Sequence, residues 1–263
     1  MTRSEYLRRQ ADLVREERIE SGSATVRLLT AGAESPRAVL LLTGVGRGAR
    51  SDTGLLLPML ARRHRVAALE LADLGDPWLD GPAAVRASLD ALGAEEAVLI
   101  GHSLGAAVAL AAGDRRVRAL ALVAGWLRPT ERLLRTARLW PMLPPDAQEE
   151  AARLLAVRSA TASSPWGADA ARMLAASARA DVAAAASDCR VPALVVGCSA
   201  DAVAGVEGAE ALLGAIDDAR YAVLDSGHAV LAERPAELLA VLEHFLADPH
   251  RDPAGSVLAR TTV

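Results

Sequence analysis

Ser103 has the surroundings of a nucleophile, because it lies within the segment Gly-His-Ser-Leu-Gly at 101–105. The apolar run 97–100 before it suits a buried strand, and the alanine-rich run 104–112 after it suits a helix. The pattern Gly-x-Ser-x-Gly between a strand and a helix is typical of a nucleophile elbow, a sharp turn with glycines at its crowded flanks. Because a serine hydroxyl is a weak nucleophile, the chain must also supply a base and an acid that orients it.

Two later segments offer the acid and the base. Residues 195–203 (Val-Val-Gly-Cys-Ser-Ala-Asp-Ala-Val) place Asp201 directly after an apolar run. Residues 224–235 (Leu-Asp-Ser-Gly-His-Ala-Val-Leu-Ala-Glu-Arg-Pro) place His228 after another. With the elbow, and in the order serine, aspartate, histidine, these loops resemble the α/β-hydrolase family over residues 24–247. All three segments lie where expected strands end, so they should meet at one edge of a sheet.

The resemblance implies a catalytic triad. Ser103 would carry a covalent acyl group, His228 would accept the serine proton as general base, and Asp201 would hold the imidazole tautomer. The backbone N–H groups of Leu104 and Val45 would form the oxyanion hole. This chemistry implies no metal and no cofactor.

Further residues are candidates for the substrate pocket. Residues 43–44 are Thr-Gly where the family usually has His-Gly, a departure that bears on loop rigidity and substrate preference. The variable elbow position, His102, either faces away from the pocket or lines it. Three of the four tryptophans lie within 126–166, and an apolar segment over the site favours an apolar substrate. The pocket candidates are Thr43, Gly44, His102, Trp126, Trp140 and Trp166.

Some polar residues compete for a role or are expected to have none. Asp225 lies close to His228 in the sequence and is an alternative to Asp201 as the orienting acid. The scattered histidines suggest no metal site. Three of them are expected on the surface: His64, His244 and His250.

The order of apolar and helical segments predicts an α/β fold, with a mostly parallel sheet and helices on both faces. Strands are expected at 38–43, 65–71, 97–100, 117–124, 191–197 and 220–224, with an antiparallel hairpin at 17–30. Helical pieces separated by prolines predict a helical cap at 126–186, inserted into a core domain of 1–125 and 187–263. Residues 1–16 suggest a helix or arm, and 248–263 a loose tail.

Composition narrows the classes of function. The 263 residues, 52% of them hydrophobic, can bury one large core, and the formal net charge of −4 offers no basic stripe to nucleic acid. The chain has no lysine, which excludes Schiff-base chemistry and the phosphate-binding P-loop. Cys189 and Cys198 do not make a disulfide framework. The N-terminus has no signal-peptide pattern, and 97–113 is too short to span a bilayer, so a cytoplasmic protein is expected.

These features predict a serine hydrolase or acyl-transfer enzyme acting on an ester or thioester of a small to medium apolar acid. Alternatives within the fold are an acyltransferase or thioesterase that works with an acyl carrier protein, and a lyase, cyclase or binding protein. The sequence leaves the oligomeric state open.

A different class is suggested by residues 43–48, Thr-Gly-Val-Gly-Arg-Gly, which resemble the dinucleotide-binding loop of short-chain NAD(P)-dependent oxidoreductases. The glycine spacing differs from Gly-x-Gly-x-x-Gly. The catalytic Tyr-x-x-x-Lys of those enzymes is also impossible in a chain without lysine. We therefore rank this alternative last.

Overall fold

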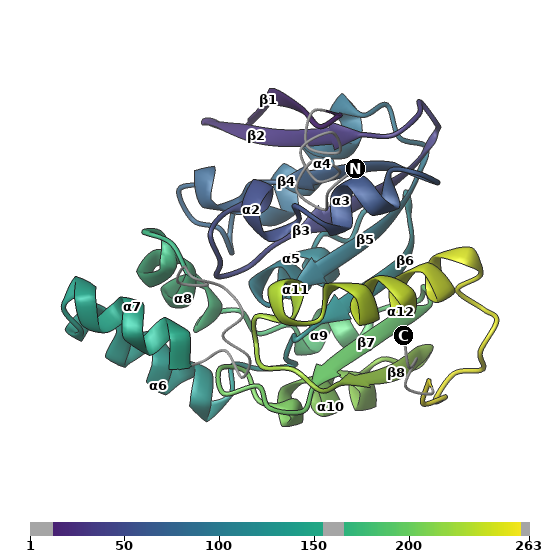
Figure 1. Ribbon diagram of the computed structural model, residues 1–263. Helices are drawn as coiled ribbons and strands as arrows, with labels where there is room; N and C mark the ends of the chain where they lie inside the picture. Colours follow the sequence, from purple (N-terminus) through teal and green to yellow (C-terminus); the bar gives the residue numbers. More distant parts are fainter. Residues whose placement is uncertain (1–12, 155–165, 259–263) are drawn as a thin grey trace, which may run out of the picture.

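The computed structural model describes residues 13–154 and 166–258. Eight strands form one sheet in the order β1-β2-β4-β3-β5-β6-β7-β8 (Figure 1). The β1–β2 and β2–β4 pairs are antiparallel and the remaining pairs are parallel. This confirms the prediction of a mostly parallel sheet. The strands are β1 (Arg15–Ser21), β2 (Ala24–Ala31), β3 (Arg37–Leu42), β4 (Arg65–Leu69), β5 (Glu96–His102), β6 (Val117–Val123), β7 (Ala193–Cys198) and β8 (Ala219–Leu224).

The central strands are apolar throughout because both of their faces are covered. In β3, Leu40 and Leu42 face one buried cluster while Val39 and Leu41 face the other, since successive side chains of a strand alternate between the two faces. Helices α4 (Gly81–Ala91), α5 (Leu104–Ala111), α9 (Ala183–Ser187) and α10 (Val206–Ala215) pack on the first face (Figure 1). Helices α2 (Ala49–Asp52), α3 (Leu56–Leu60) and α12 (Pro235–Ala247) pack on the second.

The helices alternate with the strands along most of the chain. Their bounds are α2 (Ala49–Asp52), α3 (Leu56–Leu60), η1 (Leu71–Asp73), α4 (Gly81–Ala91), α5 (Leu104–Ala111), α6 (Glu131–Leu139), η2 (Trp140–Met142), α7 (Pro145–Leu154), α8 (Ala170–Ser177), α9 (Ala183–Ser187), α10 (Val206–Ala215), α11 (Val230–Glu233) and α12 (Pro235–Ala247).

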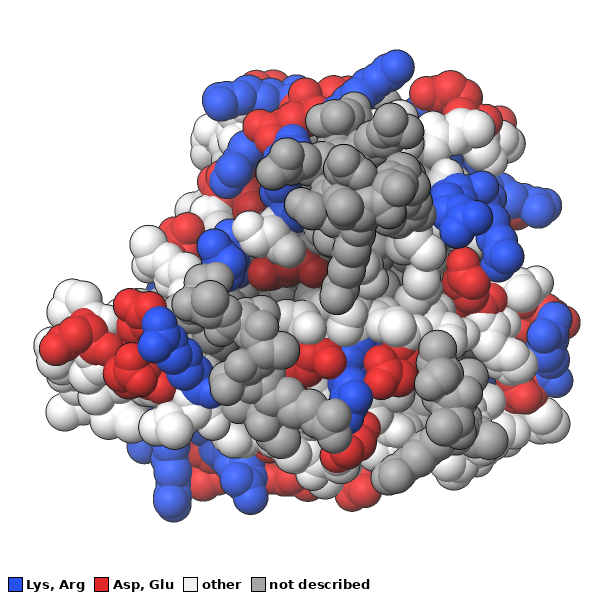
Figure 2. Space-filling model, in the orientation of Figure 1, with Lys and Arg blue, Asp and Glu red and all other residues white. Residues whose placement is uncertain are grey.

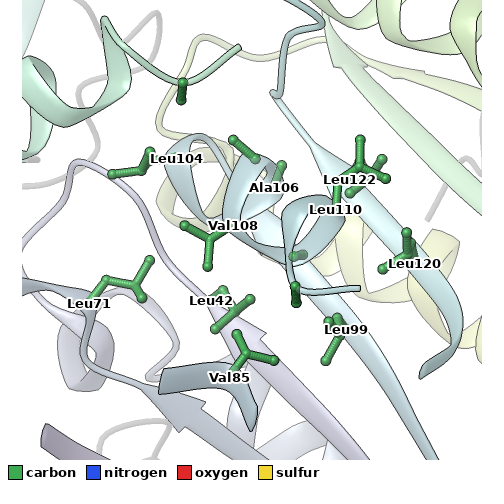
Figure 3. Close-up of a cluster of buried hydrophobic side chains, with 14 of the residues drawn as sticks. Leu42, Leu71, Val85, Leu99, Leu104, Ala106, Val108, Leu110, Leu120 and Leu122 are labelled. Atoms are coloured by element: carbon green, nitrogen blue, oxygen red, sulfur yellow. The ribbon is translucent and has the colours of Figure 1, made fainter. Parts of the chain in front are cut away.

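Helix α5 approaches strand β3 closely at Gly105, which has no side chain. A Cβ atom at Gly105 would come within 2.0 Å of the Leu42 carbonyl oxygen in β3, so only glycine fits there. Figure 3 shows the α5 side chains among those of the neighbouring strands and of α4, with Leu42, Val85, Leu99, Leu104, Ala106, Val108, Leu110, Leu120 and Leu122 labelled. This packing fixes the turn that joins β5 to α5.

The segment between β6 and β7 contains helices and no strand among its described residues. Helices α6, α7 and α8 group at one side of the molecule (Figure 1). The Thr130 hydroxyl accepts the Leu133 N–H and so caps α6. The division into a core at 1–125 and 187–263 and a cap at 126–186 stays a prediction.

Two expectations about the ends of the chain need comment. The expected tail is ordered as far as residue 258, because its backbone pairs with the edge strand β8 through hydrogen bonds between Tyr221 and both Ser256 and Leu258. The expected N-terminal helix lies mostly outside the described residues, and its last residues, Arg15 and Glu16, belong to β1.

The described surface is mixed in charge. Figure 2 shows arginine and acidic side chains side by side across one face of the molecule. Within residues 13–154 and 166–258, we find no helix long and apolar enough to cross a membrane.

Candidate active site

The turn between β5 and α5 holds Ser103 in a strained conformation. Its backbone has φ 58° and ψ −124°, and positive φ is unfavourable for a residue with a side chain. The Ser103 N–H donates to the Val123 carbonyl oxygen at 2.9 Å, which ties the turn to β6. A Cβ atom at Gly101 would lie 2.3 Å from the Gly105 carbonyl oxygen, so the flanking glycines are required by space.

The structure brings Ser103, His228 and Asp201 together from the ends of β5, β8 and β7. His228 Nε2 lies 2.9 Å from Ser103 Oγ, and His228 Nδ1 lies 2.8 Å from Asp201 Oδ2. All three residues are buried. A neutral imidazole between these partners donates from Nδ1 to the carboxylate and accepts the serine proton at Nε2. The arrangement can therefore transfer a proton from the serine hydroxyl.

Asp201 is held as a carboxylate by hydrogen bonds on both of its oxygens. Burial alone raises the pKa of Asp201, but the interaction with His228 and the hydrogen bonds from the Val203 and Ala204 N–H groups together outweigh it, and the pKa is lowered. The second oxygen, Oδ1, accepts the N–H groups of Val203 and Ala204 at 2.8 and 2.9 Å. These bonds explain why this loop can present a charged acid to the imidazole.

His102 lies behind His228 and is buried. Its Nε2 atom is 2.8 Å from the His228 carbonyl oxygen, and the two imidazole rings are tilted, with centroids 5.2 Å apart. Burial, together with the charge of His228, lowers the pKa of His102 to about 4. His102 is thus neutral at neutral pH, and Nε2 carries its proton because a carbonyl oxygen can only accept. It supports the histidine loop from the elbow.

The loop after β3 lies against the elbow. A Cβ atom at Gly44 would come within 2.6 Å of Ser103 Cβ and 2.7 Å of the Leu104 nitrogen, so the two backbones touch there. Val45 follows directly and is buried, as is Thr43. Among the described residues, no oxygen accepts a hydrogen bond from the Val45 or Leu104 N–H.

The other acid that the sequence offered lies elsewhere. The Asp225 side chain is 60% exposed, accepts the Ser199 hydroxyl at 3.4 Å and lies 3.6 Å from Arg234. Asp201 is the acid that contacts His228. Of the remaining histidines, His244 pairs with Asp252 at 2.7 Å, His64 is half-buried and His250 is exposed.

The three tryptophans of 126–166 are all buried. The Trp126 indole N–H donates to the Ala180 carbonyl oxygen at 2.9 Å, so this residue fastens the segment that follows α8. Trp140 and Trp166 meet edge to face with ring centroids 4.6 Å apart. The Gly167 N–H donates to the Gly46 carbonyl oxygen at 2.8 Å, which places Trp166 next to the loop after β3.

Carboxylates occupy two backbone N–H groups in and after the glycine-rich segment 43–48. The Arg47 N–H donates to Asp52 and the Ala49 N–H donates to Glu70. No sequence motif points to either carboxylate. Cys189 and Cys198 are free thiols. No cluster of His, Cys, Asp or Glu side chains able to hold a metal occurs in the part of the chain that the structure describes.

A family model described as "Alpha/beta hydrolase family" matches residues 39–241. The chain belongs to this family. The match covers most of the chain and includes the elbow, the acid loop and the histidine loop, so this member of the family is a hydrolase. A comparison with curated proteins gave no match.

Solved structures of several hydrolases have a similar fold. A 2-hydroxy-6-oxo-6-phenylhexa-2,4-dienoate hydrolase from Rhodococcus sp. strain RHA1 is 19% identical, with a TM-score of 0.75 over 89% of this chain and 99% of that chain. An enol-lactonase from Burkholderia xenovorans LB400 is 18% identical, with a TM-score of 0.72 over 88% of this chain and 100% of that chain. A carboxylesterase from Bacillus subtilis is 14% identical, with a TM-score of 0.70 over 92% of this chain and 96% of that chain. At these identities the likeness shows the fold alone.

Proposed function

We propose that this hydrolase cleaves esters or thioesters of small to medium apolar acids through an acyl-enzyme on Ser103. The observation that carries the proposal is the unbroken chain of hydrogen bonds from Ser103 Oγ through His228 to Asp201. An esterase and a lactonase among the structures of similar fold are in keeping with attack on an oxygen ester.

The chemistry follows from the positions of the atoms. Ser103 Oγ attacks the substrate carbonyl carbon while its proton moves to His228 Nε2. The carbonyl oxygen becomes an oxyanion, which the Val45 and Leu104 N–H groups stabilise. His228 then gives its proton to the leaving alcohol or thiol as the carbon–oxygen or carbon–sulfur bond breaks. Water, activated by His228, finally attacks the acyl-enzyme and releases the acid and Ser103.

Transfer of the acyl group to an acceptor other than water is a second proposal. Ser103 and His228 are each only 1% exposed, and a buried acyl-enzyme reacts slowly with water. An acidic carrier protein as acyl donor has weaker support, because arginines of the helical segment already pair with acids. These pairs are Arg128–Asp181, Arg132–Glu207, Arg135–Glu131 and Arg153–Glu149.

The experiment is to treat the protein with a fluorophosphonate and with p-nitrophenyl butyrate, and to follow intact mass and turnover. We expect one adduct on Ser103, and Ser103→Ala should lose the adduct and lower kcat by roughly 10³- to 10⁶-fold. Asp201→Asn should lower kcat by up to about 10⁴-fold, because the imidazole tautomer is no longer held.

The matched control is Asp225→Asn, which removes an exposed carboxylate near the same histidine loop and should leave kcat unchanged. Full activity of a folded Ser103→Ala protein would exclude nucleophilic catalysis. If Asp201→Asn kept its activity and Asp225→Asn lost it, Asp225 would be the acid that orients His228, in place of Asp201.

A further inference from the structure

The loop that carries Val45 is anchored on both sides of this residue. On one side Gly44 presses against the elbow. On the other side, both carboxylate oxygens of Asp52 lie 3.1 Å from the Arg47 nitrogen, and the Gly46 carbonyl oxygen accepts the Gly167 N–H. The Val45 N–H therefore sits between two fixed points.

The loop backbone is shaped around Asp52 and a second carboxylate, Glu70. A Cβ atom at Gly46 would come within 1.9 Å of Asp52 Oδ2. Gly48 has φ 99°, and a Cβ there would come within 2.7 Å of Glu70 Oε2. Glu70 Oε2 also accepts the Ala49 N–H at 2.8 Å. Side chains at these glycines would displace the two acids, so loop and carboxylates fit as one unit.

Burying two carboxylates near each other costs free energy, because each loses hydration and their charges repel. Glu70 is 5% exposed, and burial raises its pKa. Burial, and to a lesser extent the charge of Glu70, raises the pKa of Asp52 to about 7, against the N–H donors of Arg47 and Gly48. Arg27, 3.7 Å from Glu70, and Arg47, whose charge acts on Asp52, partly offset this repulsion. Neither acid contacts the Ser103–His228–Asp201 chain. The free-energy cost of burying the two carboxylates therefore calls for a reason other than contact with the triad.

We propose that Asp52 is a positioning residue for the oxyanion hole, which fixes the Val45 N–H by holding the adjacent stretch Gly46-Arg47 in place. The inference rests on the proposed function. The two N–H donors stabilise charge that develops only in the transition state, so a displaced Val45 N–H should lower kcat and leave substrate binding nearly intact.

The experiment compares Asp52→Ala, which removes the acceptor, with Asp52→Asn, which keeps one oxygen for the Arg47 N–H. We measure kinetics with p-nitrophenyl butyrate and inhibition by an alkyl trifluoromethyl ketone, whose adduct with the serine carries an oxyanion. Both measurements are made well below the unfolding temperature of each variant. For Asp52→Ala we expect kcat to fall about 10- to 100-fold, KM to stay within about twofold, and inhibitor affinity to fall in parallel with kcat. Asp52→Asn should recover most of the loss.

The matched control is Asp114→Ala. Asp114 also accepts a backbone N–H, from Arg116 at 2.9 Å, but it precedes β6 at the opposite end of the sheet. This variant should lower the unfolding temperature without changing kcat or inhibitor affinity. An Asp52→Ala protein that is only less stable, with unchanged kcat, would reduce Asp52 to a structural role.

If Asp52→Ala does not fold, Asp52→Glu decides, because it keeps the charge but moves the carboxylate by one methylene. A selective loss of kcat supports the positioning role, and unchanged kinetics overturn it. Fluorophosphonate labelling of the wild type is tested first. No label on Ser103 would overturn the proposed function and this inference with it, whereas a labelled wild type with unchanged Asp52 variants would overturn the inference alone.

Discussion

At the scale of single residues, His228 is held at two points. Asp201 fixes its ring at Nδ1, and His102 fixes its backbone by donating to the carbonyl oxygen. The second contact comes from the residue directly before Ser103, so the serine and the histidine are positioned by neighbouring parts of the same turn. A small shift of the elbow would therefore carry the histidine loop with it.

His102 should make the protein sensitive to acid. Its pKa is lowered from 6.5 to about 4, so the native state binds fewer protons than the unfolded state between these values, and stability is lost as the pH falls through this range. His102→Gln keeps an N–H donor but cannot titrate. Urea unfolding at several pH values should show a loss of stability between pH 6.5 and 4 that is smaller than in the wild type by up to about 3 kcal/mol.

Asp52 acts in the opposite direction. Its raised pKa means that stability falls as the pH rises from about 4 through about 7. Both the wild type and His102→Gln contain Asp52, so its effect cancels in the comparison.

His102→Leu is the control for the hydrogen-bond donor itself. It should lower the free energy of unfolding by about 1 to 3 kcal/mol at pH 7, because it leaves a buried carbonyl unpaired. Parallel stability curves for wild type and His102→Gln would contradict the assignment.

A functional residue can be predicted from the sequence only where a local motif marks it. Ser103, Asp201 and His228 each stand in a local motif at the end of an apolar run, so the sequence alone brought them forward. Asp52 and Glu70 could not be found in this way. Glu70 reaches the Ala49 N–H across 21 positions, and both acids depend on a loop conformation that no local pattern records. The buried contact of His102 likewise requires the fold.

At the scale of elements, the strands were predictable because burial on both faces makes them apolar throughout. The short helices α2, η1 and α11 were missed, since three or four residues are too few to show a period. The pairing of 255–258 with β8 was missed because edge pairing uses backbone atoms, which every sequence supplies.

The close contact of α5 with β3 predicts opposite effects for two helical glycines. Gly105→Ala would drive a Cβ to within 2.0 Å of the Leu42 carbonyl oxygen, and it should destabilise the fold by at least about 2 kcal/mol. Gly214→Ala in α10 meets nothing within 4 Å and should stabilise the fold by up to about 1 kcal/mol. Thermal unfolding of both variants measures this, and equal shifts of one sign would show that α5 can move away from the sheet.

At the scale of the whole molecule, the segment between β6 and β7 is fastened to the core by one of its helices. From α8, Arg172 donates to the carbonyl oxygens of Ala72 and Leu74. Arg179 pairs with Asp76 at 2.9 Å. Together with the Gly167–Gly46 bond, these contacts join α8 and the residues that flank it to the segments that follow β3 and β4. The helical segment is therefore held against the loop after β3.

The position of the helical segment beside the loop after β3 leads to a prediction of how kcat/KM depends on acyl chain length. If the apolar residues of 126–186 form the acyl pocket, each added methylene should contribute about 0.8 kcal/mol, close to fourfold in kcat/KM, until the pocket is full. Trp166→Ala should flatten the rise, because Trp166 adjoins Gly167, which bonds to the loop after β3, whereas Met142→Ala, at a residue 77% exposed, should not. A series of p-nitrophenyl esters from acetate to octanoate, normalised to hydroxide-catalysed hydrolysis, measures this. A flat series, or a best rate with acetate, would mean that the helical segment does not form the acyl pocket.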